Sequence, residues 1–187
     1  MNIHFHLGSW KTGTTLIQST LRKNVDSLRS MGVYYADQRL DTFREKFFRH
    51  YKQDIITIRK ALQQNKDIEL LELPSVEGVR QWLMDRQEKL VLFSWEPFFG
   101  KPLCDSNDLI YHGRETAVWL ELVSCGYSTC FTFYLRNQPD FIESVYLQEL
   151  RKGRFVAPFE KFLRERVKPR DLSWQPVVLP LIEKFGK

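Results

Sequence analysis

The amino-acid sequence predicts an α/β protein, a three-layer sandwich in which a central parallel sheet lies between helices. Short apolar, β-prone segments alternate with longer segments whose apolar residues have helical spacing, and this alternation is typical of parallel sheets. The first strand leads through a glycine-containing turn into a helix and a second strand, which makes a βαβ unit with parallel strands. With 187 residues, 43% of them hydrophobic and 27% charged, the chain has the size and composition of one folded domain with a core.

Four short segments are predicted to be the strands of this sheet. The first is a β-prone run that stops at Gly8, and the fourth is an uncharged run followed by Arg136. In chain order, the predicted strands are Ile3–Leu7, Val33–Tyr35, Leu90–Phe93 and Ser128–Leu135.

Helices are predicted where apolar residues recur at helical spacing. Gly32 ends the first helix, while Pro74-Ser75 and Pro139 mark the starts of later helices. The predicted helices are Thr14–Ser30, Val76–Gln87, Glu115–Val123, Pro139–Leu150, Pro158–Arg166 and Val177–Phe185, with a charged helical region over Asp37–Lys66 and a loop over Pro97–Tyr111.

Composition and charge argue against several classes of protein. The chain has three cysteines and none of them forms a C-x-x-C pair, which disfavours a disulfide framework or a zinc site and favours a reducing compartment. The N-terminus lacks the basic start and the apolar stretch of a signal peptide, and the longest uncharged run, Leu122–Leu135, is too short for a membrane span. We therefore expect a cytoplasmic protein without a membrane span. The net charge of +5 suits an anionic ligand, no nucleic-acid partner is expected, and the oligomeric state is left open.

The strongest functional signal is the turn between the first strand and the first helix, His6-Leu7-Gly8-Ser9-Trp10-Lys11-Thr12-Gly13-Thr14-Thr15. A turn of this kind points several backbone N–H groups into one concavity, and the helix dipole adds positive potential there. Lys11 supplies a full charge, and Thr14 and Thr15 supply hydroxyl donors. The turn therefore predicts a site for a phosphate or sulfuryl group. The alternative is an ordinary Gly-Thr turn that caps a helix.

This turn differs from the ATP- and GTP-binding motif G-x-x-x-x-G-K-[ST]. Gly8 and Gly13 have the spacing of that motif, but Thr14 stands in the place of its lysine, which here is displaced to Lys11. Magnesium-dependent enzymes of that class also need a carboxylate at the end of a neighbouring strand. Because the third strand runs into Ser-Trp and the fourth is followed by Arg136, metal-assisted ATP hydrolysis is disfavoured.

A second candidate site follows the fourth strand. Arg136 places a cation at the strand end, Asn137 is suited to cap the next helix, and Pro139 fits the first turn of that helix. Ser144 lies about two turns further along. Because ligands collect at the carboxyl ends of parallel strands, Arg136 and the glycine turn are expected at one edge, where they suit a nucleotide with two separated anionic groups. Taken alone, Arg136 is as well explained by a surface ion pair, and Ser144 by a packing role on the helix.

Together these residues resemble the sulfotransferases that use 3′-phosphoadenosine 5′-phosphosulfate (PAPS). Lys11-Thr12-Gly13-Thr14-Thr15 is similar to the K-[ST]-G-T-[ST] loop that holds the 5′-phosphosulfate in that family, and Arg136 and Ser144 are similar to its 3′-phosphate ligands. The resemblance implies a P-loop NTPase-like fold and PAPS as co-substrate. It also implies metal-independent sulfuryl transfer to a hydroxyl or amine of a carbohydrate or small-molecule acceptor.

The chain departs from the family pattern at two places. Leu16 stands where many members have an aromatic residue that stacks on adenine, and the sequence ends about where a further strand of the family would begin. We therefore expect residues 1–187 to form a single sulfotransferase-like domain that lacks the C-terminal part of the family fold.

Sulfuryl transfer to a hydroxyl needs a general base, for which the resemblance implies a residue just after the third strand. Glu96 stands there, and the alternative is a solvated loop glutamate. His6 and His112 are weaker candidates, whereas His4 and His50 are expected to be structural or solvated.

Two further functions and one further surface stay open at this point. A kinase that uses ATP or GTP is one alternative, and a non-catalytic nucleotide-binding or structural relative is another. The charged run Arg151–Arg170 is expected to be a solvated helical face, with the attraction of an acidic acceptor such as a polysaccharide as the other interpretation.

Overall fold

A computed structural model describes residues 1–8, 13–37, 49–99 and 112–186 of the chain. Within these residues, one parallel sheet has the strand order β2-β3-β1-β4. Its members are β1 (Asn2–Gly8), β2 (Val33–Asp37), β3 (Leu90–Trp95) and β4 (Ser128–Tyr134). The predicted α/β class and the parallel sheet are confirmed.

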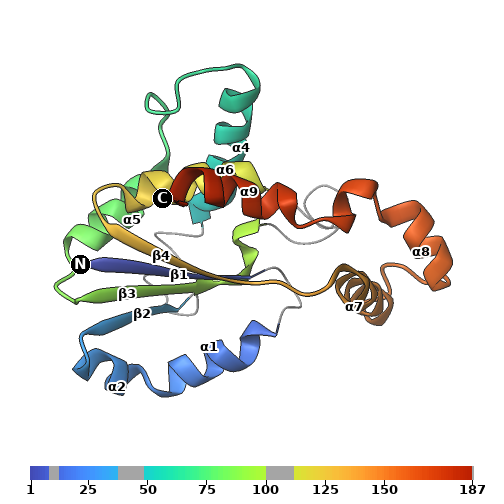
Figure 1. The fold of residues 1–187 in the computed structure, drawn as a ribbon, viewed down its shortest axis with the longest axis horizontal. Helices are drawn as coiled ribbons and strands as arrows, with labels where there is room; N and C mark the ends of the chain where they lie inside the picture. Colours follow the sequence, from blue (N-terminus) through green and yellow to red (C-terminus); the bar gives the residue numbers. More distant parts are fainter. Residues whose placement is uncertain (9–12, 38–48, 100–111, 187) are drawn as a thin grey trace.

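Helices cover both faces of this sheet, which gives the three predicted layers (Figure 1). One face carries α1 (Thr14–Lys23) and α2 (Val25–Ser30). The other carries α4 (Arg49–Gln63), α5 (Pro74–Met84), α6 (Gly113–Ser124) and α9 (Gln175–Phe185). Beyond the end of β4, α7 (Gln138–Arg151) and α8 (Phe159–Arg166) extend to the side of the sheet (Figure 1). Two short 3-10 turns, η2 (Glu96–Phe99) and η3 (Pro169–Leu172), complete the described elements.

The hydrophobic core lies between the sheet and the layer of helices that contains α5, α6 and α9. Ile3, Phe5 and Leu7 alternate along β1 and are all 0% exposed. Parallel register sets Phe5 opposite Phe93 and Phe131, and the Phe5 ring stacks on both, with centroid distances of 5.0 and 5.4 Å. The three central strands are thus joined by one row of aromatic side chains.

Three predicted segments differ from the structure in ways that bear on the fold. The single helix expected over Thr14–Ser30 is interrupted at Asn24, whose backbone leaves the helical region and whose side-chain amide donates to the Thr20 carbonyl at 2.8 Å. The helical region expected over Asp37–Lys66 contains α4, while residues 38–48 lie outside the described part. The predicted loop over Pro97–Tyr111 begins with η2, and residues 100–111 also lie outside it.

The helices above the core are tied together by a buried polar network. Asp54 of α4 accepts hydrogen bonds from the backbone N–H and the hydroxyl of Ser75, at 2.9 and 2.5 Å, and burial raises the pKa of its carboxyl group. Trp119 of α6 donates from Nε1 to the same hydroxyl at 2.8 Å.

In the described residues, no helix is long and apolar enough to cross a membrane.

Candidate functional site

The carboxyl ends of the four strands meet at one edge of the sheet, because all neighbouring pairs are parallel. Register places Leu7 beside Trp95 and Gly8 beside Tyr134. Glu96 follows one residue after β3, and Arg136 two residues after β4, so their backbones flank the end of β1 on its two sides. Neighbouring strands lie about 4.8 Å apart. The backbone positions of Gly8, Glu96 and Arg136 are therefore neighbours along one edge of the sheet.

The first helix begins at this edge without a capping side chain. Gly13 is its N-cap residue and has φ 84° and ψ 12°, a left-handed conformation that glycine adopts without a steric cost. Gly13 forms no side-chain capping hydrogen bond, and the first turn of α1 contains no acidic residue. Thr14 is buried and Thr15 is exposed. This helix end therefore presents its donors and its positive dipole to an anion. Lys11 and Thr12 lie outside the described residues.

The segment after β4 is held firmly to the neighbouring helices. Asn137 caps α7 as predicted, with its side-chain oxygen accepting from the Asp140 N–H at 3.0 Å. The Arg136 carbonyl accepts a hydrogen bond from Nε1 of Trp174 at 2.7 Å, while the Arg136 side chain is exposed. The backbone that carries this cation is therefore fixed from both sides.

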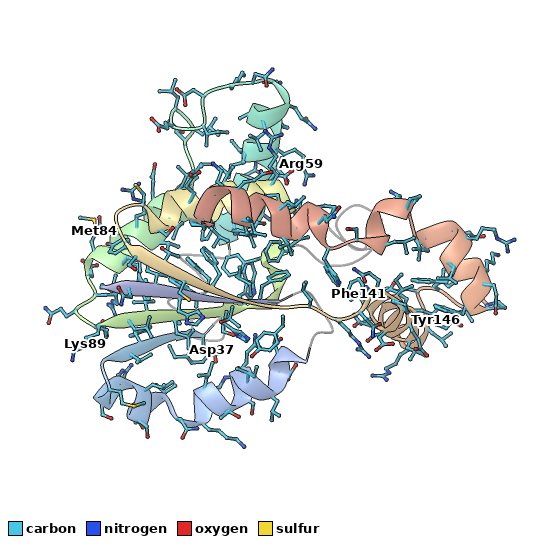
Figure 2. The ribbon with its side chains drawn as sticks, viewed as in Figure 1. Asp37, Arg59, Met84, Lys89, Phe141 and Tyr146 are labelled. Carbon is cyan, nitrogen blue, oxygen red and sulfur yellow. The ribbon has the colours of Figure 1, made fainter. Side chains whose placement is uncertain are left out.

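Ser144 lies two helical turns into α7 and is half-buried. Its neighbours Phe141 and Val145 belong to the buried side of the helix, and Figure 2 shows Phe141 between α7 and the body of the molecule. Ser144 therefore lies next to the buried side of this helix. Its role as a ligand stays a prediction, as do the roles of Thr14, Thr15 and Arg136.

The two histidines of β1 lie on the face of the sheet that α1 covers. His6 is 6% exposed, and its Nδ1 is hydrogen-bonded to the Ser94 hydroxyl at 2.6 Å. His4 is hydrogen-bonded through Nε2 to the Thr132 hydroxyl at 2.8 Å. Burial lowers the pKa of both imidazoles, and the charge of His4 lowers the pKa of His6 further. Both rings are therefore neutral near pH 7, and His6 is enclosed within the fold rather than presented to an acceptor.

The two other candidates for the general base, Glu96 and His112, lie on different elements. Glu96 begins the 3-10 turn η2 at the carboxyl edge, but its side chain is outside what the structure describes. His112 is the N-cap residue of α6, with φ 61°, and its Nδ1 is hydrogen-bonded to the Arg59 guanidinium. Figure 2 shows Arg59 in the outer helical layer, so His112 belongs to the packing of α4 on α6.

Sequence reasoning missed a polar seam between α1 and the sheet. Asp37, at the carboxyl end of β2, is buried and forms an ion pair with Arg22 of α1, and Figure 2 shows Asp37 between the sheet and that helix. The buried residues of α1 are Thr14 and Gln18, which lie one turn apart on the stripe that continues to Arg22. The alternation of polar residues along the first strand was the available signal. In the described part of the chain, no group of three or more His, Cys, Asp or Glu side chains is arranged to hold a metal ion.

Comparisons with known proteins add a fold-level likeness. Neither a protein-family model nor a curated protein sequence matches the chain significantly. One solved structure, a crystal structure of a sulfotransferase from Alicyclobacillus acidocaldarius, aligns over 100% of this chain and 70% of its own. The identity is 16% and the TM-score is 0.48. A likeness of this size is compatible with many activities.

Proposed function

We propose that this protein is a sulfotransferase that moves a sulfuryl group from PAPS to a hydroxyl or amine acceptor. One observation carries the proposal: β1 and β4 pair directly, and in the sequence β1 leads toward Lys11–Thr15 while β4 leads to Arg136. Two anion-binding elements on adjacent strands suit a nucleotide with an anionic group at each end of its ribose. A single phosphate would need only one of them.

The donor groups match such a nucleotide chemically. The uncapped start of α1 offers backbone N–H groups, and Lys11, Thr12, Gly13, Thr14 and Thr15 supply a cation, hydroxyl donors and a close backbone approach for the 5′-phosphosulfate. At the other strand end, the exposed guanidinium of Arg136 and the hydroxyl of Ser144 would hold the 3′-phosphate.

Two residues would carry the transfer itself. The acceptor oxygen forms a bond to sulfur while the bond from sulfur to the bridging oxygen breaks, so negative charge builds on that oxygen and a proton leaves the acceptor. Lys11 would stabilise the charge, a contribution of about 10²-fold or more in rate for one preorganised donor. Glu96 would accept the proton, and Phe98 and Phe99, which follow it closely in the sequence, have buried side chains.

The kinase alternative receives less support from the carboxyl edge. Among the described strands, β2 ends in a carboxylate, Asp37, but β3 separates β2 from β1 and Asp37 already forms an ion pair with Arg22. That carboxylate is therefore already paired and belongs to a strand that is not a neighbour of β1.

The proposal is tested by comparing two nucleotides on one variant. Arg136→Ala should lose roughly 1.5–3 kcal/mol of affinity for adenosine 3′,5′-diphosphate, the value for a hydrogen bond to a charged group. Adenosine 5′-phosphosulfate, which has no 3′-phosphate, should bind the variant and the native protein almost equally. Calorimetric titration measures both affinities, with Arg80→Ala on the surface of α5 as the matched control. Equal losses for the two nucleotides would show that Arg136 supports the fold and not the 3′-phosphate.

A further inference from the structure

The outward face of α7 changes from acidic to apolar to basic along its length. Exposed side chains of this helix recur at spacings of three and four residues, so they form one stripe along it. In chain order, the residues of this stripe are Asp140, Glu143, Leu147, Leu150 and Arg151. We call them the outer stripe. The buried residues of α7, among them Phe141 and Val145, lie on the opposite side of the helix.

The middle of the outer stripe is apolar and open to solvent. Leu147 is 48% exposed and Leu150 is 39% exposed. Figure 1 shows α7 and α8 to the side of the sheet, so this helix lies at the periphery of the molecule. Burial of the two leucines against an apolar surface would stabilise a complex by roughly 25 cal/mol for each Å² removed from water.

The charges at the two ends of the outer stripe can pair with a partner. Within the described residues, Glu143 and Arg151 are exposed and neither of them forms an ion pair. Asp140 adds a second exposed carboxylate at the acidic end. Arg154 follows the basic end, and its side chain is 51% exposed although it pairs with Glu149. The stripe therefore has opposite charges at its two ends and leucines between them.

This order of side chains is self-complementary when two copies of α7 pack antiparallel. A two-fold axis at the level of Leu147 reverses the direction of the second helix. A residue four positions before Leu147 then lies at the height of the residue four positions after it in the second copy, about 6 Å from the axis along the helix. Glu143 is thus set against Arg151 of the second copy, and the symmetry repeats this contact. Antiparallel packing also aligns the two helix dipoles favourably.

We propose that the outer stripe of α7 is the interface through which two copies of this chain form an antiparallel, two-fold dimer. A second copy supplies by symmetry a surface with the complementary order of charges, whereas a polymer of one charge would be repelled by one end of the stripe. One helix face buries less than the about 1,200 Å² of a standard interface, so we expect weak association. The inference concerns assembly and does not rest on the proposed sulfotransferase function.

The test exchanges the two charges that are set against each other. Glu143→Arg places two guanidinium groups at one height and Arg151→Glu places two carboxylates there, so each variant should weaken self-association about tenfold or more at low salt. The double variant, with both changes in one chain, restores opposite charges and should associate nearly as the native chain does. An equimolar mixture of the two single variants should form heterodimers for the same reason. Sedimentation equilibrium over the micromolar range measures each association.

Matched controls make the same charge changes elsewhere. Glu77→Arg and Arg80→Glu lie on the exposed surface of α5 and should leave self-association unchanged. Circular dichroism verifies that every variant folds. Equal weakening by these controls would overturn the inference, because net charge alone would then explain the effect.

Three further results would overturn the inference. The native chain could stay monomeric over the whole concentration range. It could form a dimer that both charge reversals leave intact, which would assign the contact to another face. The single variants could lose association without recovery in the double variant or in the mixture, which would show that Glu143 and Arg151 do not lie opposite each other. Loss in both single variants with recovery in both combinations supports the antiparallel dimer.

Discussion

The two faces of the central sheet differ in the side chains that they bury: one face buries apolar side chains and the other buries polar ones. One face of β1 presents Ile3, Phe5 and Leu7 to the large helical layer, and all three are fully buried. The other presents His4 and His6 to α1, where they pair with hydroxyl groups of the flanking strands. The apolar face gains free energy from the burial of hydrocarbon, whereas the polar face must satisfy each hydrogen-bonding group.

This difference indicates that the two faces have different structural roles. Burial of apolar side chains is non-directional and stabilises the fold as a whole. Hydrogen bonds of buried polar groups have fixed directions, and here they join β1 to β3 and β4 just before the strands reach the carboxyl edge. We infer that the polar face sets the relative positions of the strand ends that carry the candidate site.

The largest expected effect comes from the apolar face. Phe5→Ala should lower the free energy of unfolding by about 3–5 kcal/mol, because it removes a fully buried ring that stacks on Phe93 and Phe131. Urea denaturation followed by circular dichroism measures the change. Leu16→Ala, at a side chain that is 74% exposed on α1, is the control and should change stability by less than about 0.5 kcal/mol. Similar losses for the two variants would contradict the description of this face as the core.

A smaller loss is expected on the polar face. Ser94→Ala removes the hydroxyl that pairs with Nδ1 of the buried His6 and should cost about 1–3 kcal/mol of unfolding free energy. Ser27→Ala, on an exposed turn of α2, should leave stability nearly unchanged. Thermal unfolding of the three proteins distinguishes the cases. A neutral Ser94→Ala would mean that the hydroxyl–imidazole pair does not stabilise the fold.

The smallest expected effect is a dependence of stability on pH. The pKa values of His4 and His6 are lowered in the folded protein from the ordinary 6.5, so below that pH the unfolded chain binds protons that the folded chain does not. Stability should be fully present above pH 6.5 and should fall as the pH decreases toward the lowered pKa values. His4→Gln with His6→Gln should reduce this slope, measured as unfolding free energy at pH 7.5 and 5.5. The exposed His50→Gln should keep it, and an equal slope in all three proteins would exclude the two strand histidines as its source.

Local patterns in the sequence predict the order and positions of the strands well. Both ends of each predicted strand lie within two residues of the observed ends, because glycine, proline and apolar spacing act over a few residues. The break at Asn24 was missed because apolar spacing continues through it; it is visible in the structure as non-helical backbone and a side-chain hydrogen bond to the Thr20 carbonyl.

The candidate site was predictable only at the level of the sheet edge. Parallel strands bring Gly8, Glu96 and Arg136 to one edge whatever their side chains do. The pairing of His6 with Ser94 and of His4 with Thr132 joins residues 88 and 128 positions apart, which no local pattern specifies. Such pairs depend on strand order and register, and these follow from packing of the complete chain.

The most direct test of the central claim is a calorimetric titration of the native protein with adenosine 3′,5′-diphosphate in the presence of EDTA. A parallel titration uses ATP with magnesium. If the strand ends of β1 and β4 form a PAPS site, the diphosphate should bind without metal and more tightly than ATP with magnesium. Tighter binding of ATP that depends on magnesium, or no binding of the diphosphate by the folded protein, would contradict the assignment.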